Sequence, residues 1–295
     1  MGLSRFNRAF QTMALIVHKY GGTSMGSTER IRNVAKRVAK WARAGHQMVV
    51  VPSAMSGETN RLLGLAKELF PGVNTAASDR ELDMIASTGE QVSVGLLSLA
   101  LQAEGLEAVS YTGWQVAVKT DSSYTKARIE CIDDVRVRAD LAAGKVVVIT
   151  GFQGIDEAGH ITTLGRGGSD TSAVAIAAAV KADRCDIYTD VDGVYTTDPR
   201  IVPKAKRLDK IAFEDMLELA SQGAKVLQVR SVELGMVHNM PIFVRSSFDK
   251  PEDIDPHANQ PPGTLICSEE EIMESHVVTG IAFSKESADL RASDR

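Results

Sequence analysis

Short apolar runs alternate with stretches of helical periodicity along most of this 295-residue chain, and this alternation restricts the possible folds more than any other feature. The run at 146–150 is continuously β-branched, as expected of a strand buried on both faces of a sheet. Between residues 31 and 42, apolar side chains instead recur on one face of a helix. Strands separated by helices pair in parallel. The sequence therefore predicts an α/β/α sandwich, three layers with a mainly parallel central sheet.

Composition narrows the class of partner. Lys and Arg number 33 against 38 for Asp and Glu, which weighs against nucleic-acid binding because that usually needs clustered basic residues. No apolar run approaches the length of a membrane span, and the longest, at 173–180, is Ala-rich. The three cysteines are widely spaced and form no zinc or disulfide pattern. We expect a cytoplasmic protein with a small-molecule substrate.

The first polar segment whose residues could bind a ligand is KYGGTS at 19–24, directly after the first predicted strand. Its spacing is not that of a P-loop. Lys19 followed by Gly21 and Gly22 still offers a cation and close backbone amides to a polyphosphate. A structural turn with a surface lysine is the alternative.

The second segment, TTLGRGGSD at 162–170, opens an Ala-rich helix. Arg166 offers a planar fork that suits a carboxylate or a phosphate, and Asp170 would lie close to it. The alternative interpretation makes Ser169 a plain N-cap and Asp170 an acid that complements the helix dipole. Three glycines around an arginine exceed what a cap needs, which favours function.

The third segment, TDVDGVYTTDPR at 189–200, is a polar loop after a strand. Its length and its mixture of Tyr, Thr and Arg indicate a loop that covers a nucleotide. Lys225 is a further cation after a predicted helix and is equally consistent with a solvated lysine.

Together with three other motifs, these segments resemble the aspartokinases of the amino-acid kinase superfamily. The motifs are KYGGTS at 19–24, SAMSGETN at 53–60, STGE at 87–90, TTLGRGGSDTSA at 162–173, TDVDGVYTTDPR at 189–200 and GAKVLQVRS at 223–231. The resemblance runs in order from about residue 13 to 263. It implies phosphorylation of the β-carboxylate of L-aspartate by ATP with Mg²⁺, giving 4-phospho-L-aspartate, the first step toward lysine, threonine and methionine.

The resemblance also implies residue roles. It places Lys19 and Asp170 as catalytic residues, with Lys19 on the transferring phosphoryl group and Asp170 organising the cations. The implied aspartate-binding residues are Ser53, Thr59, Glu90, Arg166 and Ser169, with Arg166 on the α-carboxylate and Glu90 on the α-ammonium. The implied nucleotide-binding residues are Lys19, Gly21, Gly22, Thr189, Asp190, Tyr195, Asp198, Pro199, Arg200 and Lys225. Mg²⁺ would be held mainly through the ATP phosphates, so no protein ligand for a metal is named.

Aspartokinases continue into paired regulatory ACT domains. We expect a loose leader at 1–12, an amino-acid kinase catalytic domain at 13–266, and a linker with the start of an ACT region at 267–295. This implies weakened feedback by lysine and threonine, with a homodimer or an associated regulatory subunit as candidate partners. Rival interpretations are acetylglutamate kinase, glutamate 5-kinase or uridylate kinase, and a non-catalytic binding module.

Overall fold

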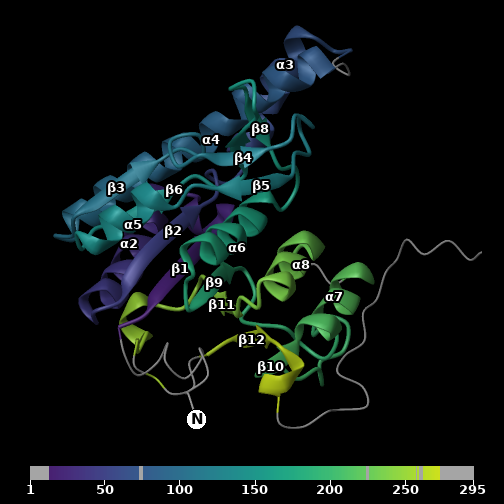
Figure 1. The fold of residues 1–295 in the computed structure, drawn as a ribbon. Helices are drawn as coiled ribbons and strands as arrows, with labels where there is room; N and C mark the ends of the chain where they lie inside the picture. Colours follow the sequence, from purple (N-terminus) through teal and green to yellow (C-terminus); the bar gives the residue numbers. More distant parts are fainter. Residues whose placement is uncertain (1–12, 73–75, 224–225, 257, 259–261, 273–295) are drawn as a thin grey trace, which may run out of the picture.

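A sheet of eight strands runs through the centre of the described part of the molecule (Figure 1). The computed structural model describes residues 13–72, 76–223, 226–256, 258 and 262–272. In spatial order the strands are β10 (Lys210–Ala212), β12 (Thr264–Cys267), β11 (Ile242–Ser246), β9 (Arg184–Thr189), β1 (Leu15–Tyr20), β2 (Gln47–Pro52), β6 (Val146–Ile149) and β3 (Ala108–Tyr111). From β11 to β3 all neighbours are parallel, while β12 runs antiparallel to β11. The predicted, mainly parallel sheet is confirmed.

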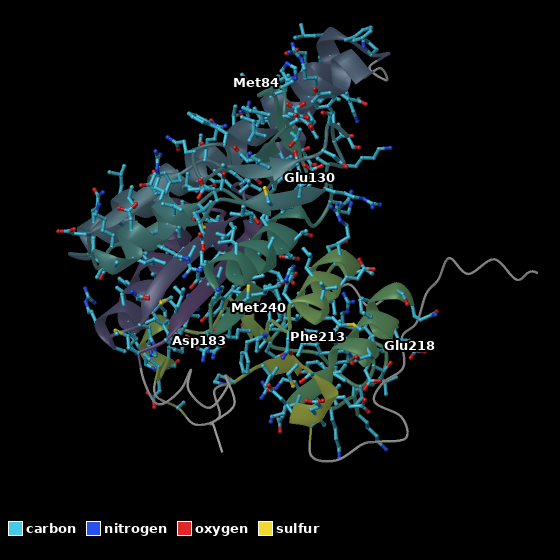
Figure 2. The ribbon with its side chains drawn as sticks, viewed as in Figure 1. Met84, Glu130, Asp183, Phe213, Glu218 and Met240 are labelled. Carbon is cyan, nitrogen blue, oxygen red and sulfur yellow. The ribbon has the colours of Figure 1, made fainter. Side chains whose placement is uncertain are left out.

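Helices cover both faces of this sheet, so the predicted three layers are also confirmed (Figure 1). One face carries α5 (Val135–Ala142), α6 (Gly168–Val180), α7 (Phe213–Ser221) and α8 (Val229–Val237); the other carries α2 (Thr28–Arg43) and α4 (Ala76–Ala103). Side chains alternate across each strand. Val17 accordingly joins the core under α6, whereas Ile16 joins the core under α2. Phe213 and Met240 lie inside the first of these cores, and Glu218 is exposed (Figure 2).

Helix α4 is one continuous helix, although Gly89 lies inside it, where a glycine usually weakens a helix. Gly89 permits a close approach instead: a Cβ there would lie 2.9 Å from the Ala54 Cβ. Among the described residues, α4 is also the one helix long and apolar enough, over Ser78–Ala103, to cross a membrane by length and composition, which inspection for apolar runs missed. Half of its most apolar window is buried, and α4 packs on α2, α3 (Glu58–Leu69) and β3, as a core helix does.

A second, four-stranded sheet lies beside α4, and the sequence did not predict it. Its order is β5 (Ile129–Ile132), β4 (Val118–Thr120), β7 (Gln153–Ile155) and β8 (Ile161–Thr163). These strands have three or four residues each, too few to display a period of two. Gly154 lets β4 and β7 approach, since a Cβ there would lie 2.5 Å from the Val118 carbonyl oxygen. This small sheet delivers β8 to the start of the loop that contains Arg166.

Three short 3-10 helices complete the described elements. They are η1 (Gly22–Met25), η2 (Pro251–Asp253) and η3 (Glu269–Glu271). The proline-rich stretch at 249–263 holds η2 and otherwise no helix or strand in its described part. The predicted leader at 1–12 and most of the region predicted at 267–295 lie outside the described residues, so both domain boundaries stay predictions.

A buried charged cluster occupies the α2 side of β1, β9 and β11. Asp186 lies 2.7 Å from the Nε of Arg184 and 3.2 Å from the Nε of Arg245, and all three side chains are at most 5% exposed. His18 lies 3.7 Å from the same carboxylate. Burial lowers the pKa of His18 to about 3 against the attraction of Asp186, so its ring is neutral. Two guanidinium groups therefore share one carboxylate in the core.

Aromatic rings help to accommodate these buried cations. The guanidinium of Arg184 lies 4.8 Å from the ring centre of Trp41, and that of Arg245 lies 4.4 Å from the ring centre of Phe243. Arg37 of α2 lies 4.8 Å above Tyr188 and donates to the carbonyl oxygens of Ser247 and Asp249. Such contacts stabilise a desolvated cation by about 2 kcal/mol or more. This arginine–aromatic cluster ties α2 to β1, β9 and β11.

Candidate active site

A cavity of about 170 Å³ lies where β1 and β2 end. Its lining consists of Lys19, Ser53, Thr59, Glu90, Phe152, Gly165, Arg166, Gly167, Gly168, Ser169 and Asp170. The carboxyl ends of parallel strands meet at one edge of a sheet, which is where α/β proteins usually bind ligands. The cavity thus brings together both predicted catalytic residues and every residue predicted for the aspartate site. Their roles stay predictions.

Lys19 and Asp170 form an ion pair in this cavity. Lys19 is on the α6 side of β1, and its Nζ lies 2.6 Å from Oδ1 of Asp170, in the first turn of α6. Their side chains are only 10% and 13% exposed, so the pair is screened far less than a surface ion pair. A Cβ at Gly21 would lie 3.6 Å from that Nζ. Glycine at this position leaves room beside the ammonium group.

The loop before α6 turns on two glycines with positive φ, Gly165 at 77° and Gly167 at 73°. Gly167 is the N-cap of α6 and no side chain caps the helix, so the alternative that made Ser169 an N-cap is wrong. The first turn of α6 lines the cavity, and the positive end of a helix favours an anion there. The Arg166 side chain is exposed and makes no hydrogen bond or ion pair with any described residue.

Glu90 supplies a buried carboxyl group on the other side of the cavity. It is 3% exposed, and its Oε1 accepts a hydrogen bond from the Ala54 amide at 3.2 Å. Within the described chain, its Oε2 has no hydrogen-bond partner. Burial raises the pKa of Glu90 to about 7, although the Ala54 bond opposes this. A buried carboxyl oxygen without a partner is suited to a cationic ligand group.

Glu90→Gln is expected to change how stability depends on pH. The pKa of Glu90 rises from 4.5 to about 7 on folding, so the folded state holds the proton more tightly. Stability from this group is complete below pH 4.5 and is lost as pH rises through 7. At about 1.4 kcal/mol per pH unit, the loss is on the order of 3 kcal/mol. Urea unfolding at pH 5 and pH 8 should therefore show that the free energy of unfolding of Glu90→Gln, relative to that of the wild type, is higher at pH 8 than at pH 5. Glu81→Gln, at an exposed position, is the control and should keep the wild-type pH dependence. The same pH dependence of stability in Glu90→Gln and the wild type would contradict the raised pKa of Glu90.

The glycine turn after β1 meets the end of β9. The Gly21 amide donates to the Tyr188 carbonyl oxygen at 3.3 Å, and a Cβ at Gly22 would lie 3.2 Å from the Ala54 carbonyl oxygen. Thr189 ends β9, and its hydroxyl donates to Asp190 at 3.2 Å. The predicted nucleotide residues Thr189 and Asp190 thus lie one strand away from Lys19, beside the cavity and outside its lining.

The rest of the 189–200 loop is held by its own polar contacts. The Tyr195 hydroxyl donates to Asp192, whose carboxylate also lies 3.3 Å from Arg207. Asp198 pairs with Arg200 at 2.8 Å, and their hydrogen bond lowers the pKa of Asp198. The Arg200 side chain remains 86% exposed, and Pro199 beside it is exposed too. None of these predicted nucleotide residues lines the cavity. Lys225 lies outside the described residues.

Phe152 lines the cavity and was missed by the sequence reasoning. It follows β6 directly after Gly151, has a φ of 67°, and donates its amide to the Ser172 hydroxyl of α6 at 2.9 Å. A positive φ is uncommon outside glycine and often marks a functional site. The only signal in the sequence was its position immediately after a buried strand.

Comparison with known proteins agrees with this geometry. Residues 14–246 match the amino acid kinase family. The chain is 59% identical to the aspartokinase of Pseudomonas aeruginosa over 280 residues, covering 94% of this chain and 65% of that protein. It therefore spans slightly less than two thirds of that relative.

Solved structures give the same result. The aspartate kinase of Synechocystis superposes with a TM-score of 0.73 at 48% identity, over 86% of this chain and 40% of that one. Aspartokinase III of E. coli, in complex with aspartate and ADP, superposes with a TM-score of 0.71 at 29% identity, over 86% of this chain and 64% of that one. Because the family match covers residues 14–246, and the sheet and cavity agree with it, this chain belongs to the amino acid kinase family.

Proposed function

We propose that this chain is the catalytic unit of an aspartate kinase, which converts ATP and L-aspartate to ADP and 4-phospho-L-aspartate. The main support is the single cavity that gathers Lys19, Asp170, Glu90 and Arg166. The 59% identical aspartokinase and the aspartokinase III structure with aspartate and ADP support the same substrates. The product would enter lysine, threonine and methionine synthesis in the cytoplasm.

The cavity offers complementary charges to an amino-acid substrate. Arg166 would hold the α-carboxylate, with its guanidinium uncommitted to any described residue, and Glu90 would hold the α-ammonium through its unpaired Oε2. Hydroxyl groups of Ser53, Thr59 and Ser169 line the remaining wall. The volume of about 170 Å³ is below the roughly 300–1,000 Å³ of pockets for drug-sized ligands, which favours a small metabolite.

The reaction needs no general base. The side chain of free aspartate has a pKa of about 3.9, so it is already a carboxylate at neutral pH. One of its oxygens attacks the γ-phosphorus, and the bond to the bridging oxygen breaks with its electron pair leaving on ADP. Two anions must approach each other, so charge neutralisation is the main requirement. Lys19, in the cavity lining, supplies it, and Asp170 holds the Lys19 ammonium at 2.6 Å.

The nucleotide would lie along the carboxyl ends of β1 and β9. Gly21 and Gly22 would take the phosphates, because Gly21 leaves room beside the Lys19 ammonium and Gly22 lets the backbone approach the Ala54 carbonyl oxygen. Thr189, Asp190, Tyr195, Asp198, Pro199, Arg200 and Lys225 complete the proposed nucleotide site.

Mg²⁺ fits this site as an ion held chiefly by ATP. Among the described residues no group of three or more His, Cys, Asp or Glu side chains is arranged to hold a metal, and Asp170 is already paired with Lys19. In kinases Mg²⁺ keeps several waters and binds substrate phosphates, where it neutralises negative charge. The part left to this chain is to hold Lys19 beside the phosphates.

The decisive test is an ADP-release assay with ATP, Mg²⁺ and L-aspartate, in which hydroxylamine traps the acyl phosphate. We expect ADP and aspartyl hydroxamate in equal amounts, and little product with acetylglutamate, glutamate or UMP as acceptor. Folded protein that releases no ADP in response to aspartate would refute the proposed activity. Turnover of one of the other acceptors would reassign the substrate within the family.

Arg166→Ala is expected to raise the KM for aspartate by roughly tenfold to a hundredfold, since a hydrogen bond to a charged group contributes about 1.5–3 kcal/mol. The KM for ATP should change little, because Arg166 lines the cavity away from the 189–200 loop. Initial-rate kinetics with each substrate varied in turn measure both constants. An unchanged aspartate KM would remove Arg166 from the substrate site.

A further inference from the structure

The position of Arg166 is set by its backbone, because its side chain has no partner among the described residues. Its two glycine neighbours, Gly165 and Gly167, adopt positive φ and add conformational freedom in the unfolded chain. A loop of this kind keeps one geometry only if neighbouring groups fix it. The contacts of Thr163 and Leu164, just before the loop, are therefore decisive.

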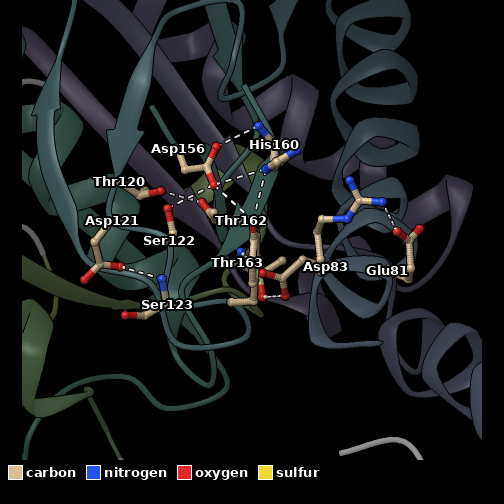
Figure 3. A network of polar contacts seen from close by, with 12 residues as sticks. Glu81, Asp83, Thr120, Asp121, Ser122, Ser123, Asp156, His160, Thr162 and Thr163 are labelled. Carbon is tan, nitrogen blue, oxygen red and sulfur yellow. Dashed lines mark hydrogen bonds and ion pairs between the residues drawn. The ribbon is translucent and has the colours of Figure 1, made fainter. Parts of the chain in front are cut away.

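Asp83 of α4 holds the first of these residues. Its Oδ2 accepts from the Thr163 amide at 2.8 Å, and its Oδ1 accepts from the Thr163 hydroxyl at 2.5 Å. Oδ2 also accepts from the Thr125 amide at 2.9 Å. Asp83 is 1% exposed, and Figure 3 shows its carboxylate against Thr163. One buried carboxylate thus joins α4 to two separate segments.

Arg230, on helix α8, holds the second of these residues, Leu164. Its guanidinium donates to the Leu164 carbonyl oxygen at 2.9 Å and to the Ala127 carbonyl oxygen at 3.0 Å. The Ala127 amide in turn donates to the Thr163 carbonyl oxygen at 2.9 Å. Asp83 and Arg230 therefore both form hydrogen bonds to the same two segments, 125–127 and 163–164.

These bonds satisfy the backbone immediately before the loop completely. The Thr163 amide binds Asp83, its carbonyl binds Ala127, the Leu164 carbonyl binds Arg230, and the Leu164 amide donates to Phe152 at 2.9 Å. The bonds to charged groups are the stronger ones. Removal of either charged side chain leaves buried backbone groups without partners.

We propose that Asp83 and Arg230 are positioning residues that fix Arg166 relative to Glu90 and so set the affinity for aspartate. Asp83 and Glu90 are seven residues apart on the same helix, close to two turns. The bonds of Asp83 to Thr163 therefore fix the position of the loop that contains Arg166 relative to α4, the helix that also carries Glu90. The proposal rests on the proposed function, because it assigns Arg166 and Glu90 to opposite ends of one substrate.

The test uses Asp83→Asn and Arg230→Met in the full chain. We expect each to raise the aspartate KM roughly tenfold or more, with kcat and the KM for ATP changed far less, since small displacements of binding groups are costly. Arg230→Lys should recover part of the loss, because an ammonium can still reach a carbonyl oxygen. A merely structural defect would reduce the active fraction and kcat, and would leave both KM values alone.

Asp156→Asn is the matched control. Asp156 directly follows β7 and is also a buried carboxylate. Among the described residues it accepts from Ser122, Tyr124 and His160, none of which belongs to 163–167. Figure 3 shows Asp156 with Ser122 and His160. Arg138→Met controls for the arginine, since Arg138 donates to Ala179 in α6. Both controls should keep the wild-type aspartate KM.

Hydrogen exchange at the Thr125 and Thr163 amides gives a readout that does not need turnover. Faster exchange at both in Asp83→Asn, and not in Asp156→Asn, supports the positioning role, and unchanged exchange overturns it. Wild-type protein without aspartate-dependent ADP release overturns the proposed function, whatever the exchange shows. Active wild type with unchanged aspartate KM in both variants overturns the positioning role alone.

Discussion

Lys19→Ala is expected to lower kcat by about a thousandfold or more while the KM for aspartate changes little. Removing one preorganised donor from developing negative charge costs roughly 10²–10³ in kcat, and Lys19 contributes a full charge at a nearly buried position. The substrate carboxylate and ammonium would be held by Arg166 and Glu90, which the substitution does not touch. Steady-state rates with saturating ATP measure the effect.

The control for this experiment is Lys119→Ala, which removes an exposed lysine from β4. It should leave kcat unchanged. Thermal unfolding checks the fold of Lys19→Ala, because Asp170 loses its ion-pair partner. A large rise in the aspartate KM with near-normal kcat would contradict the role of Lys19 at the phosphoryl group.

Asp186→Asn is expected to destabilise the protein by about 3–5 kcal/mol, the usual cost of removing one partner from a buried ion pair. Arg184 and Arg245 would keep their charges in a core where Asp186 is the neighbouring carboxylate. Urea unfolding measures the loss. Asp183→Asn is the control: among the described residues this carboxylate accepts one hydrogen bond, from the Leu15 amide, so the cost should stay near 1 kcal/mol or below.

The pH dependence of Asp186 has a definite sign. Burial alone would raise its pKa, but Arg184, Arg245 and His18 outweigh burial, and the pKa lies below 3.8. Stability from this group is therefore complete above pH 3.8 and is lost as pH falls through the folded-state pKa. Asp186→Asn should lose less stability than the wild type on acidification. A loss below about 1 kcal/mol at pH 7 would contradict the proposed cost of removing this buried carboxylate from Arg184 and Arg245.

The strands with continuous apolar runs could be predicted from the sequence, because burial on both faces excludes polar residues from them. β6, with its four consecutive β-branched residues, is the clearest case. The small sheet could not be predicted, since β7 and β8 have three residues each and depend on pairing and on contacts with α4. The continuity of α4 through Gly89 could not be predicted either, because a helix-breaking glycine and a close-packing glycine look alike in a sequence.

Some residues of the candidate site could likewise be predicted from the sequence, and others could not. Lys19, Glu90 and Arg166 lie in motifs that could be matched to a family, and the structure brings them to one cavity. Asp83 and Arg230 act on backbone groups 80 and 66 residues away, at Thr163 and Leu164. Contacts with backbone groups impose no residue type on their partners, and the hydroxyl of Thr163 adds only a single Ser or Thr position, so these contacts leave little pattern in the sequence. Phe152 was missed for a related reason, since its backbone geometry is not encoded in a motif.

β1 has a different function on each of its two faces, and this restricts how its length can change. Lys19 faces the cavity, while its neighbours His18 and Tyr20 face the arginine–aromatic cluster. An insertion or deletion of a single residue within β1 would exchange the faces, placing an ammonium group among the buried guanidinium groups and an imidazole beside the cavity proposed to take the phosphates. If the proposed activity holds, engineering of this chain for new acceptors should therefore leave β1 intact and vary the loops that follow β2 and β8.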